Sequence, residues 1–203
     1  MKRKAHTSLL LLLAAGVSFT FAQSTDSKFD ALTENGQITI NGQTANYLIR
    51  RLPPSSFPDL PASIADQANQ RGCLIPQTYE AHRPENVIHA SLENTGSRDW
   101  ALLCSVKGTV SLLVFFANAP EQPIVLATAP ETERLQAHSS SHILGFNWGI
   151  DPASPERVHD AQIGLDHRPP APDHDALADS IVDRKTIYHF YSKGKWTLVD
   201  LPD

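Results

Sequence analysis

Runs of apolar residues bounded by turn-forming residues dominate the middle of the chain. Three such runs cover residues 86–92, 100–106 and 110–117, and short polar turns separate them. β-favouring runs joined by short turns typically form antiparallel neighbours. The sequence therefore predicts a three-stranded antiparallel meander, which a fourth strand over residues 123–128 would extend.

The middle run of this meander is apolar at both odd and even positions. Leu102 and Cys104 point to one side of the predicted strand, and Ala101 and Leu103 point to the other. A strand that is apolar on both faces belongs in the centre of a sheet covered on both sides. We therefore expect four side chains of this strand and its neighbour to be deeply buried: Leu102, Leu103, Leu113 and Phe115.

Short elements flank the meander. Apolar residues at helical spacing followed by Gly72 predict a helix over residues 62–71. Turn dipeptides at Asn35–Gly36 and Asn41–Gly42 bracket a β-favouring run and predict an N-terminal hairpin that continues into residues 47–49. Further runs predict a strand over 143–150 and a C-terminal hairpin over 186–201. The fold class that follows is α+β and mostly antiparallel β, with a central meander and one or two short helices.

A long segment near the C-terminus is rich in proline, histidine and aspartate. Residues 151–175 form this segment, and we expect it to lie on the surface with at most a helical turn near residues 155–158. His159, His167 and His174 are its candidate metal ligands, because imidazole binds zinc and other transition metals. Their spacings fit no established ligand motif, so we expect them to be dispersed in solvent, and no cofactor is predicted.

The N-terminus has the three parts of a secretory signal peptide. Cations at positions 2–4 precede an apolar run over residues 9–17, and small residues end at Ala22. A run of nine apolar residues is about half of what a membrane-spanning helix needs. We expect cleavage after Ala22, which would leave residues 23–203 as a single globular domain without a membrane span, exported to the periplasm or secreted. Residues 23–28 are polar, and we expect them to be disordered.

The chain has two cysteines, Cys73 and Cys104. In an exported protein, two thiols normally form a disulfide bond. The predicted bond would attach the C-terminal end of the helix over residues 62–71 to the central strand of the meander. A catalytic cysteine is the less favoured interpretation, because an exported nucleophilic thiol would need protection from forming a disulfide bond with the second cysteine.

Charge excludes one class of partner. The full chain carries a net charge of −5, and signal cleavage removes three cations and no acidic residue, which leaves 14 basic against 22 acidic residues. Nucleic-acid binding depends on a basic patch that displaces counterions from the phosphates. Since the longest basic cluster in residues 23–203 is Arg50–Arg51, we expect no nucleic-acid partner.

Residues 91–102, SLENTGSRDWAL, resemble the calcium-loop segment of FG-GAP repeats. Gly96, Asp99 and Ala101 agree with the pattern of that family, whereas Ser91, Glu93 and Thr95 stand where most of its calcium ligands are. Calcium prefers six to eight oxygen ligands with several carboxylates among them. The resemblance thus implies a shared β-hairpin geometry without the metal site.

A wider resemblance covers most of the chain. The segments GCLIPQ from Gly72, ENVI from Glu85 and DWALLCS from Asp99, with a closing tyrosine-rich strand and Gly194–Lys195–Trp196, resemble a group of exported bacterial proteins. This resemblance implies a common fold and export. The group has no assigned activity that could be carried over to this chain.

Two hypotheses about function remain. The chain has no nucleophile elbow, phosphate-binding glycine loop, dinucleotide fingerprint or haem-binding cysteine pattern. A non-catalytic module that binds an envelope or extracellular protein or a glycan is therefore favoured over a hydrolase or metal-dependent enzyme with a site at residues 151–175. Four aromatic residues are candidates for a ligand-stacking surface: Trp148, Tyr188, Tyr191 and Trp196. Their use in core packing or cross-strand pairs is the competing interpretation.

Overall fold

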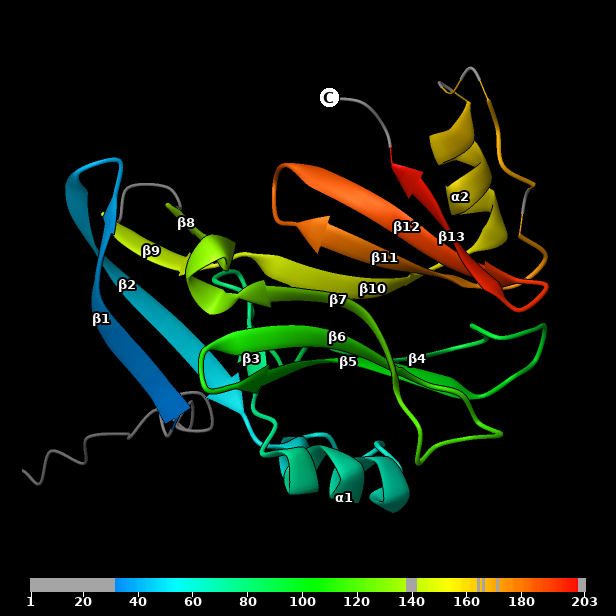
Figure 1. Ribbon diagram of the computed structural model, residues 1–203, viewed down its shortest axis with the longest axis horizontal. Coiled ribbons are helices and arrows are strands. Elements are labelled where there is room, and N and C mark those ends of the chain that lie inside the picture. Colours follow the sequence, from blue (N-terminus) through cyan, green and yellow to red (C-terminus); the bar gives the residue numbers. More distant parts are fainter. Residues whose placement is uncertain (1–31, 138–141, 164, 166, 171, 201–203) are drawn as a thin grey trace, which may run out of the picture.

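The computed structural model describes residues 32–137, 142–163, 165, 167–170 and 172–200. Within them, two four-stranded antiparallel sheets pack face to face, and one helix covers the outer face of each (Figure 1). A third sheet lies beside this sandwich, at the left of Figure 1. The signal peptide predicted at residues 1–22 and the disorder predicted at 23–28 lie outside the described residues.

The first sheet of the sandwich, here called the meander sheet, confirms the predicted topology. Each of its strands pairs antiparallel with the next one along the chain. The strands are β4 (Val87–Ala90), β5 (Asp99–Val106), β6 (Thr109–Phe115) and β7 (Ile124–Pro130). Lys107 and Gly108 both have positive φ in the turn between β5 and β6, the geometry of a tight hairpin.

The C-terminal sheet has the same simple order. Its strands are β10 (Trp148–Ala153), β11 (Ala176–Ile181), β12 (Lys185–Ser192) and β13 (Lys195–Asp200). The C-terminal hairpin predicted from the sequence is β12 and β13, joined by a turn at Lys193–Gly194. β11 was not expected, and it inserts between β10 and β12.

The N-terminal sheet combines strands from distant parts of the chain. It contains β1 (Thr33–Ile40), β2 (Gln43–Leu52), β3 (Ile75–Gln77), β8 (Leu135–Ala137) and β9 (Ile143–Phe146). β2 pairs parallel with β9, and the other pairs are antiparallel. The hairpin turn is at Asn41–Gly42 as predicted, but Asn35–Gly36 is not a turn and lies inside β1. Gly36 allows the ring of Tyr47 on β2 to lie across it, since a Cβ atom would lie 2.8 Å from that ring and would displace it.

Two α-helices cover the sandwich. α1 (Ala62–Arg71) ends at Gly72, whose φ of 74° is the left-handed conformation that terminates many helices, and this prediction is confirmed. α2 (Pro155–Gln162) packs on the C-terminal sheet through Val158. The prediction of a largely irregular segment over 151–175 is therefore incomplete, because its first residues extend β10 and a capped eight-residue helix follows. The described elements also include two single-turn 3₁₀ helices: η2 (Pro54–Ser56) and η3 (Glu131–Arg134).

The core has three parts that follow the layers. The inner faces of the two sheets enclose the largest part, which includes Leu103 and Trp148. α1 packs against the outer face of the meander sheet over Leu102, Leu113 and Phe115, and α2 covers the outer face of the C-terminal sheet. Leu102, Leu103, Leu113 and Phe115 are each at most 2% exposed, which confirms that β5 and β6 are covered on both sides.

The disulfide bond between Cys73 and Cys104 is present, with 4.9 Å between the two Cα atoms. It attaches the end of α1 to the outer face of β5, as predicted. Among the described residues, no helix is long and apolar enough to cross a membrane.

Asn86 joins the two sheets of the sandwich. Its side-chain amide donates to the carbonyls of Pro76 and Trp148 at 2.7 and 3.1 Å, and its side-chain oxygen accepts from the backbone N–H of Ile150 at 3.0 Å. The residue is 2% exposed and has a φ of 67°, a conformation that asparagine tolerates better than most residues. This buried amide fixes the start of β4 against β10.

Candidate ligand-binding cleft

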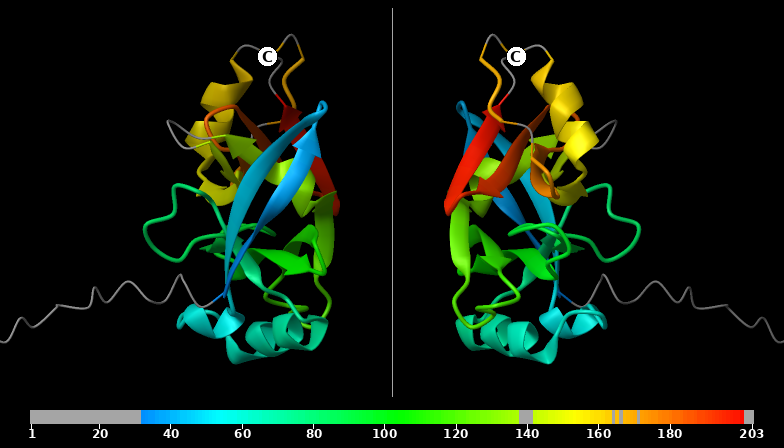
Figure 2. Two further views of the ribbon diagram at one scale, coloured as in Figure 1. Left: turned by 90° about the vertical axis from the view of Figure 1, so that its left-hand side faces the viewer. Right: turned by 90° about the vertical axis from the view of Figure 1, so that its right-hand side faces the viewer.

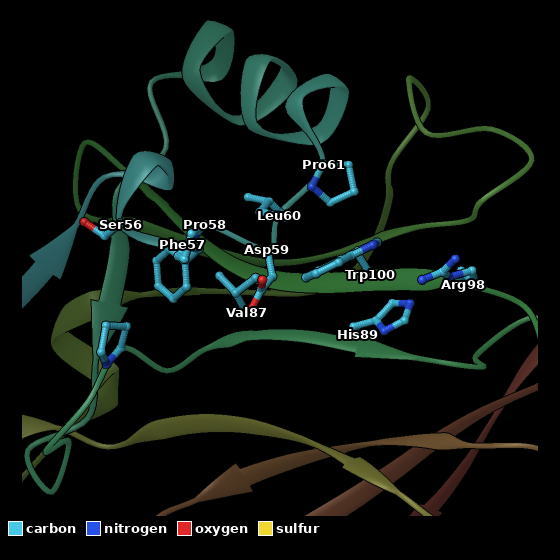
Figure 3. Close-up of a pocket in the computed structure, with 11 residues that line it drawn as sticks. Ser56, Phe57, Pro58, Asp59, Leu60, Pro61, Val87, His89, Arg98 and Trp100 are labelled. Carbon is cyan, nitrogen blue, oxygen red and sulfur yellow. The ribbon is translucent and has the colours of Figure 1, made fainter.

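An open cleft of about 750 Å³ lies between residues 56–61 and the first two strands of the meander sheet (Figure 3). Small-ligand sites usually measure about 300–1,000 Å³. The lining residues come from the chain before α1, from the segment before β4, from β4, from the end of the loop before β5, and from β5. They are Ser56, Phe57, Pro58, Asp59, Leu60, Pro61, Pro84, Val87, His89, Arg98 and Trp100.

Proline and local hydrogen bonds fix the wall formed by residues 56–61. The backbone N–H groups of Ser56 and Leu60 donate to the carbonyls of Pro53 and Phe57 at 2.9 and 3.1 Å. Leu60 is only 6% exposed, and it anchors the segment in the core beneath α1. Because proline fixes φ, little backbone freedom remains to be lost when a ligand binds to this wall.

Aromatic side chains define the two ends of the cleft. His89 on β4 and Trp100 on β5 are directly paired across the strands, and their ring centroids lie 4.8 Å apart at an angle of 33°. Figure 3 shows Phe57 at the opposite end, with Asp59 and Val87 between the two ends. Trp100 and Phe57 are only partly buried, so both rings offer apolar surface to a ligand.

Charged side chains of both signs border the cleft. Asp59 and Arg98 are exposed, and within the described part of the chain neither has a hydrogen-bond or ion-pair partner. A guanidinium is a rigid donor and a carboxylate is an acceptor. The cleft therefore offers both kinds of hydrogen-bonding group next to apolar surface.

The Asp99 side chain holds the loop that ends at Arg98, directly before Trp100 on β5. Its carboxylate is fully buried and accepts from the backbone N–H groups of Leu92, Glu93 and Ala117 at 2.9, 2.7 and 2.8 Å, and also from the Ser97 hydroxyl. Both oxygens are thus occupied by donors of the chain. In the segment that resembles a calcium loop, this carboxylate stabilises the turn.

The disulfide bond supports the cleft from behind. Cys104 lies on the same face of β5 as Trp100 and Leu102, and Cys73 follows α1 directly. The bond holds this end of α1 against the strand that presents Trp100. The bond lies at the end of α1 opposite to the wall, so it fixes the helix that follows the wall against the strand that forms the floor.

The four aromatic residues singled out in the sequence lie elsewhere. Trp148 is fully buried, and its indole N–H donates to Asp179, which also contacts the imidazole of His189 at 3.1 Å. Tyr188 is 8% exposed and packs beneath α2. Both residues belong to the core of the sandwich, as the competing interpretation expected.

Tyr191 and Trp196 form a cross-strand pair on β12 and β13. Their ring centroids lie 5.2 Å apart, and Phe116 packs against Tyr191 at 4.9 Å and stacks on Trp196 at 6.1 Å. The three rings close one edge of the space between the two sheets. This cluster is separate from the cleft, which none of its members lines.

The structure does not bring the three candidate metal-binding histidines together into a site. His159 on α2 and His167 are exposed, whereas His174 is buried with its Nδ1 2.6 Å from the Asp173 carboxylate. The hydrogen bond from His174 lowers the pKa of the Asp173 carboxyl. Over the described ranges, no group of three or more histidine, cysteine, aspartate or glutamate residues is arranged to hold a metal ion.

A buried ionic network lies at the junction with the N-terminal sheet. Glu131 is 4% exposed and accepts from the Arg51 Nε and Nη2 at 2.9 and 2.5 Å and from the Ser105 hydroxyl at 2.6 Å. Arg51 also pairs with Glu34 at 2.8 Å. The carboxylate and guanidinium satisfy each other in a bidentate arrangement, which is typical of a structural contact.

Sequence reasoning did not identify Phe57, His89, Arg98 and Trp100 as a group. Trp100 was expected in the meander, but its pairing with His89 depends on the strand register, and its approach to Phe57 depends on the path of the chain before α1. The one available signal was the proline-punctuated stretch from residue 53 to residue 61. Such a stretch predicts a rigid surface segment without indicating what it faces.

Comparisons of the chain with protein-family models, with curated proteins and with solved structures found no match. The geometry and chemistry of the cleft are therefore the basis for assigning a function.

Proposed function

We propose that this protein is an exported, non-catalytic binding module whose ligand site is the cleft at Phe57 and Trp100. The observation that carries the proposal is the half-buried Trp100 ring, which is held from behind by the disulfide-linked core and borders a cleft of ligand-binding size. Aromatic rings offer a large contact area with few rotatable bonds, so they provide binding energy at a low entropic cost.

The rigidity of the surroundings supports the same proposal. The wall is stiffened by proline, the floor belongs to a sheet covered on both faces, and the Asp99 carboxylate fixes the preceding loop. A preorganised site spends less of its contact energy on ordering side chains and loops. This arrangement suits a platform for recognition.

The environment of His89 favours binding over catalysis at this site. A general base needs an oriented ring within hydrogen-bond reach of the group that it serves. The His89 ring instead packs on Trp100, and among the described residues no carboxylate orients it. The exposed His159 and His167, candidates of the enzyme alternative, likewise have no such partner in the described part of the chain.

Nuclear magnetic resonance offers a direct test, because the three tryptophan indole N–H groups lie in different surroundings. A small-molecule panel of sugars, short peptides and aromatic acids is expected to contain ligands that shift the Trp100 signal and leave the buried Trp148 signal unchanged. Binders that shift only Trp196 or residues of α2 would contradict the proposal. Turnover of generic nitrophenyl esters, phosphates or glycosides that is lost in the His89→Ala variant would also contradict it.

Export is tested separately. Mass spectrometry of the protein from a native host fraction is expected to find an N-terminus at Gln23, because the small residues before it fit signal peptidase. Recovery of the protein with residues 1–22 attached would contradict export with cleavage.

A further inference from the structure

We propose that the ligand of this cleft is a neutral glycan chain whose sugar rings pack on Trp100 and Phe57. This inference rests on the proposed binding function and adds the chemical class of the ligand. It is carried by three observations: the unpaired charges of opposite sign, the position of the aromatic rings at the two ends, and the proline-rich wall.

The charges favour a neutral ligand rich in hydroxyl groups. Asp59 can only accept hydrogen bonds when ionised and Arg98 can only donate them, whereas a hydroxyl group does both. A polyanion would meet the Asp59 carboxylate, and a cation would meet the Arg98 guanidinium. A row of sugar hydroxyls satisfies both side chains without burying an unpaired charge.

The aromatic rings favour a ligand with repeated flat apolar faces. The C–H faces of a sugar ring are apolar and its edge carries hydroxyl groups, so a sugar can cover an aromatic ring while its edge bonds polar side chains. Figure 3 shows Phe57 and Trp100 at opposite ends of the open cleft, with the Asp59 side chain between them. This order of apolar, polar and apolar groups matches successive rings of an oligosaccharide.

The proline-rich wall disfavours an extended peptide. A peptide in a groove normally bonds its carbonyl groups to backbone or side-chain donors of the receptor. Pro58, Pro61 and Pro84 line this cleft, and none of them has a backbone N–H. The same absence weakens phosphate binding, which relies on backbone N–H groups. The prolines thus reduce the number of backbone donors along the cleft and increase the share of recognition that falls to side chains, which suits hydroxyl groups.

The test measures binding of defined oligosaccharides by isothermal titration calorimetry. The probes are hexasaccharides of β-1,4-glucose, β-1,4-N-acetylglucosamine, β-1,4-mannose and α-1,4-glucose, with a proline-rich decapeptide and inorganic phosphate as competing ligand classes. At least one hexasaccharide is expected to bind, and Trp100→Ala is expected to weaken its binding at least tenfold.

Substitutions at two exposed positions test the proposal without depending on whether the Trp100→Ala variant folds. Asp59→Ala and Arg98→Ala break no hydrogen bond or ion pair among the described residues, and each is expected to weaken glycan binding at least fivefold. Asp160→Ala on α2 and Arg184→Ala in the turn after β11 are the matched controls, expected to change affinity less than twofold. If Trp100→Ala does not fold, Asp59→Ala and Arg98→Ala decide the result.

The outcomes separate this inference from the function on which it rests. If the peptide or phosphate binds with the same dependence on Asp59, Arg98 and Trp100, the glycan assignment is wrong and the binding function stands. If no hexasaccharide binds, the glycan assignment is likewise overturned, and the resonance panel decides the function. Glycan binding that none of the three cleft variants weakens would overturn both proposals.

Discussion

Replacing Asp99 by asparagine should destabilise the protein strongly, although the two side chains have nearly the same shape. The buried carboxylate accepts from the backbone N–H groups of Leu92, Glu93 and Ala117 and from the Ser97 hydroxyl. An asparagine replaces one acceptor oxygen by an NH₂ donor. In either orientation of the amide, that NH₂ group faces at least one backbone N–H that the carboxylate satisfies, from Ala117 on one side or from Leu92 and Glu93 on the other.

The expected loss follows from these contacts. Hydrogen bonds to a charged group contribute about 1.5–3 kcal/mol each, and leaving a buried donor unsatisfied costs about 1–3 kcal/mol. The remaining bonds survive in Asp99→Asn but weaken, because the acceptor is no longer charged. We expect the free energy of unfolding to fall by about 2–4 kcal/mol for Asp99→Asn, and by more for Asp99→Ala.

Urea unfolding followed by tryptophan fluorescence and far-ultraviolet circular dichroism measures this loss. The matched control is Asp160→Asn on the exposed face of α2, where we expect a change within about 0.5 kcal/mol. A change of that small size for Asp99→Asn would refute the role assigned to the carboxylate.

Adding calcium tests whether the Asp99 carboxylate only stabilises the loop or also binds a metal ion, as in the family that this segment resembles. If the carboxylate serves the chain alone, 1 mM calcium and 1 mM EDTA should give the same unfolding midpoint. A midpoint that rises with calcium in the wild type, but not in Asp99→Asn, would show that the oxygens bind the ion.

Three further predictions concern stability and titration. Leu103→Ala should lower the free energy of unfolding by about 2–5 kcal/mol in urea, because the side chain is fully buried, and a loss near 0.5 kcal/mol would show that β5 is not central. Replacing Cys73 and Cys104 together by serine should cost about 3–4 kcal/mol through the entropy of the unfolded chain, and an unchanged urea midpoint would contradict this. Burial and the hydrogen bond donated to Asp183 raise the pKa of Tyr79 to about 12. Since the native state then holds this proton above pH 10, the stabilising contribution of Tyr79 is present below pH 10 and is lost as the pH rises through about 12. The hydrogen bond to Glu34 also raises the pKa of Tyr47, so the absorbance titration at 295 nm should show a late component that Asp183→Asn shifts to lower pH only in part.

Local patterns predicted the elements that depend on neighbours in sequence. The meander, α1 and the C-terminal hairpin are all encoded by apolar runs and turn residues within short windows. The disulfide bond followed from the number of cysteines and the expected compartment. These features can be predicted without knowing which elements pack against one another.

Elements defined by distant contacts were harder to predict. The single strand expected over residues 143–150 is two strands, because Asn147 lies at the point where the chain leaves the N-terminal sheet and enters the C-terminal sheet. Its backbone N–H donates to Arg134 and its carbonyl accepts from Val182, both at 2.9 Å. Each of these partners is a tertiary contact, so the break leaves no mark in the hydrophobic pattern.

The cleft was unpredictable for the same reason. Phe57 and Trp100 are separated by α1, β3 and β4 along the chain, and the prolines between them indicate stiffness but not direction. The aromatic residues chosen from the sequence were selected as a class, and burial then placed Trp148 in the core and left Trp100 partly accessible. Composition could not distinguish the two.

The parallel pairing of β2 with β9 imposes a delay during synthesis. Asn46 pairs with Ile143, so the partner of β2 is made about 5–20 s later at ordinary elongation rates, whereas a hairpin such as β1–β2 closes in about 1–10 µs. Until then the part of β2 around Asn46 has an open edge, which is a template for aggregation, because β3 pairs only with the end of β2 at Arg50–Leu52. The outer part of the hairpin carries polar cross-strand pairs, Gln37 with Asn46 and Thr39 with Thr44. These side-chain contacts join β2 to β1 while the segment at Asn46 waits for its second partner.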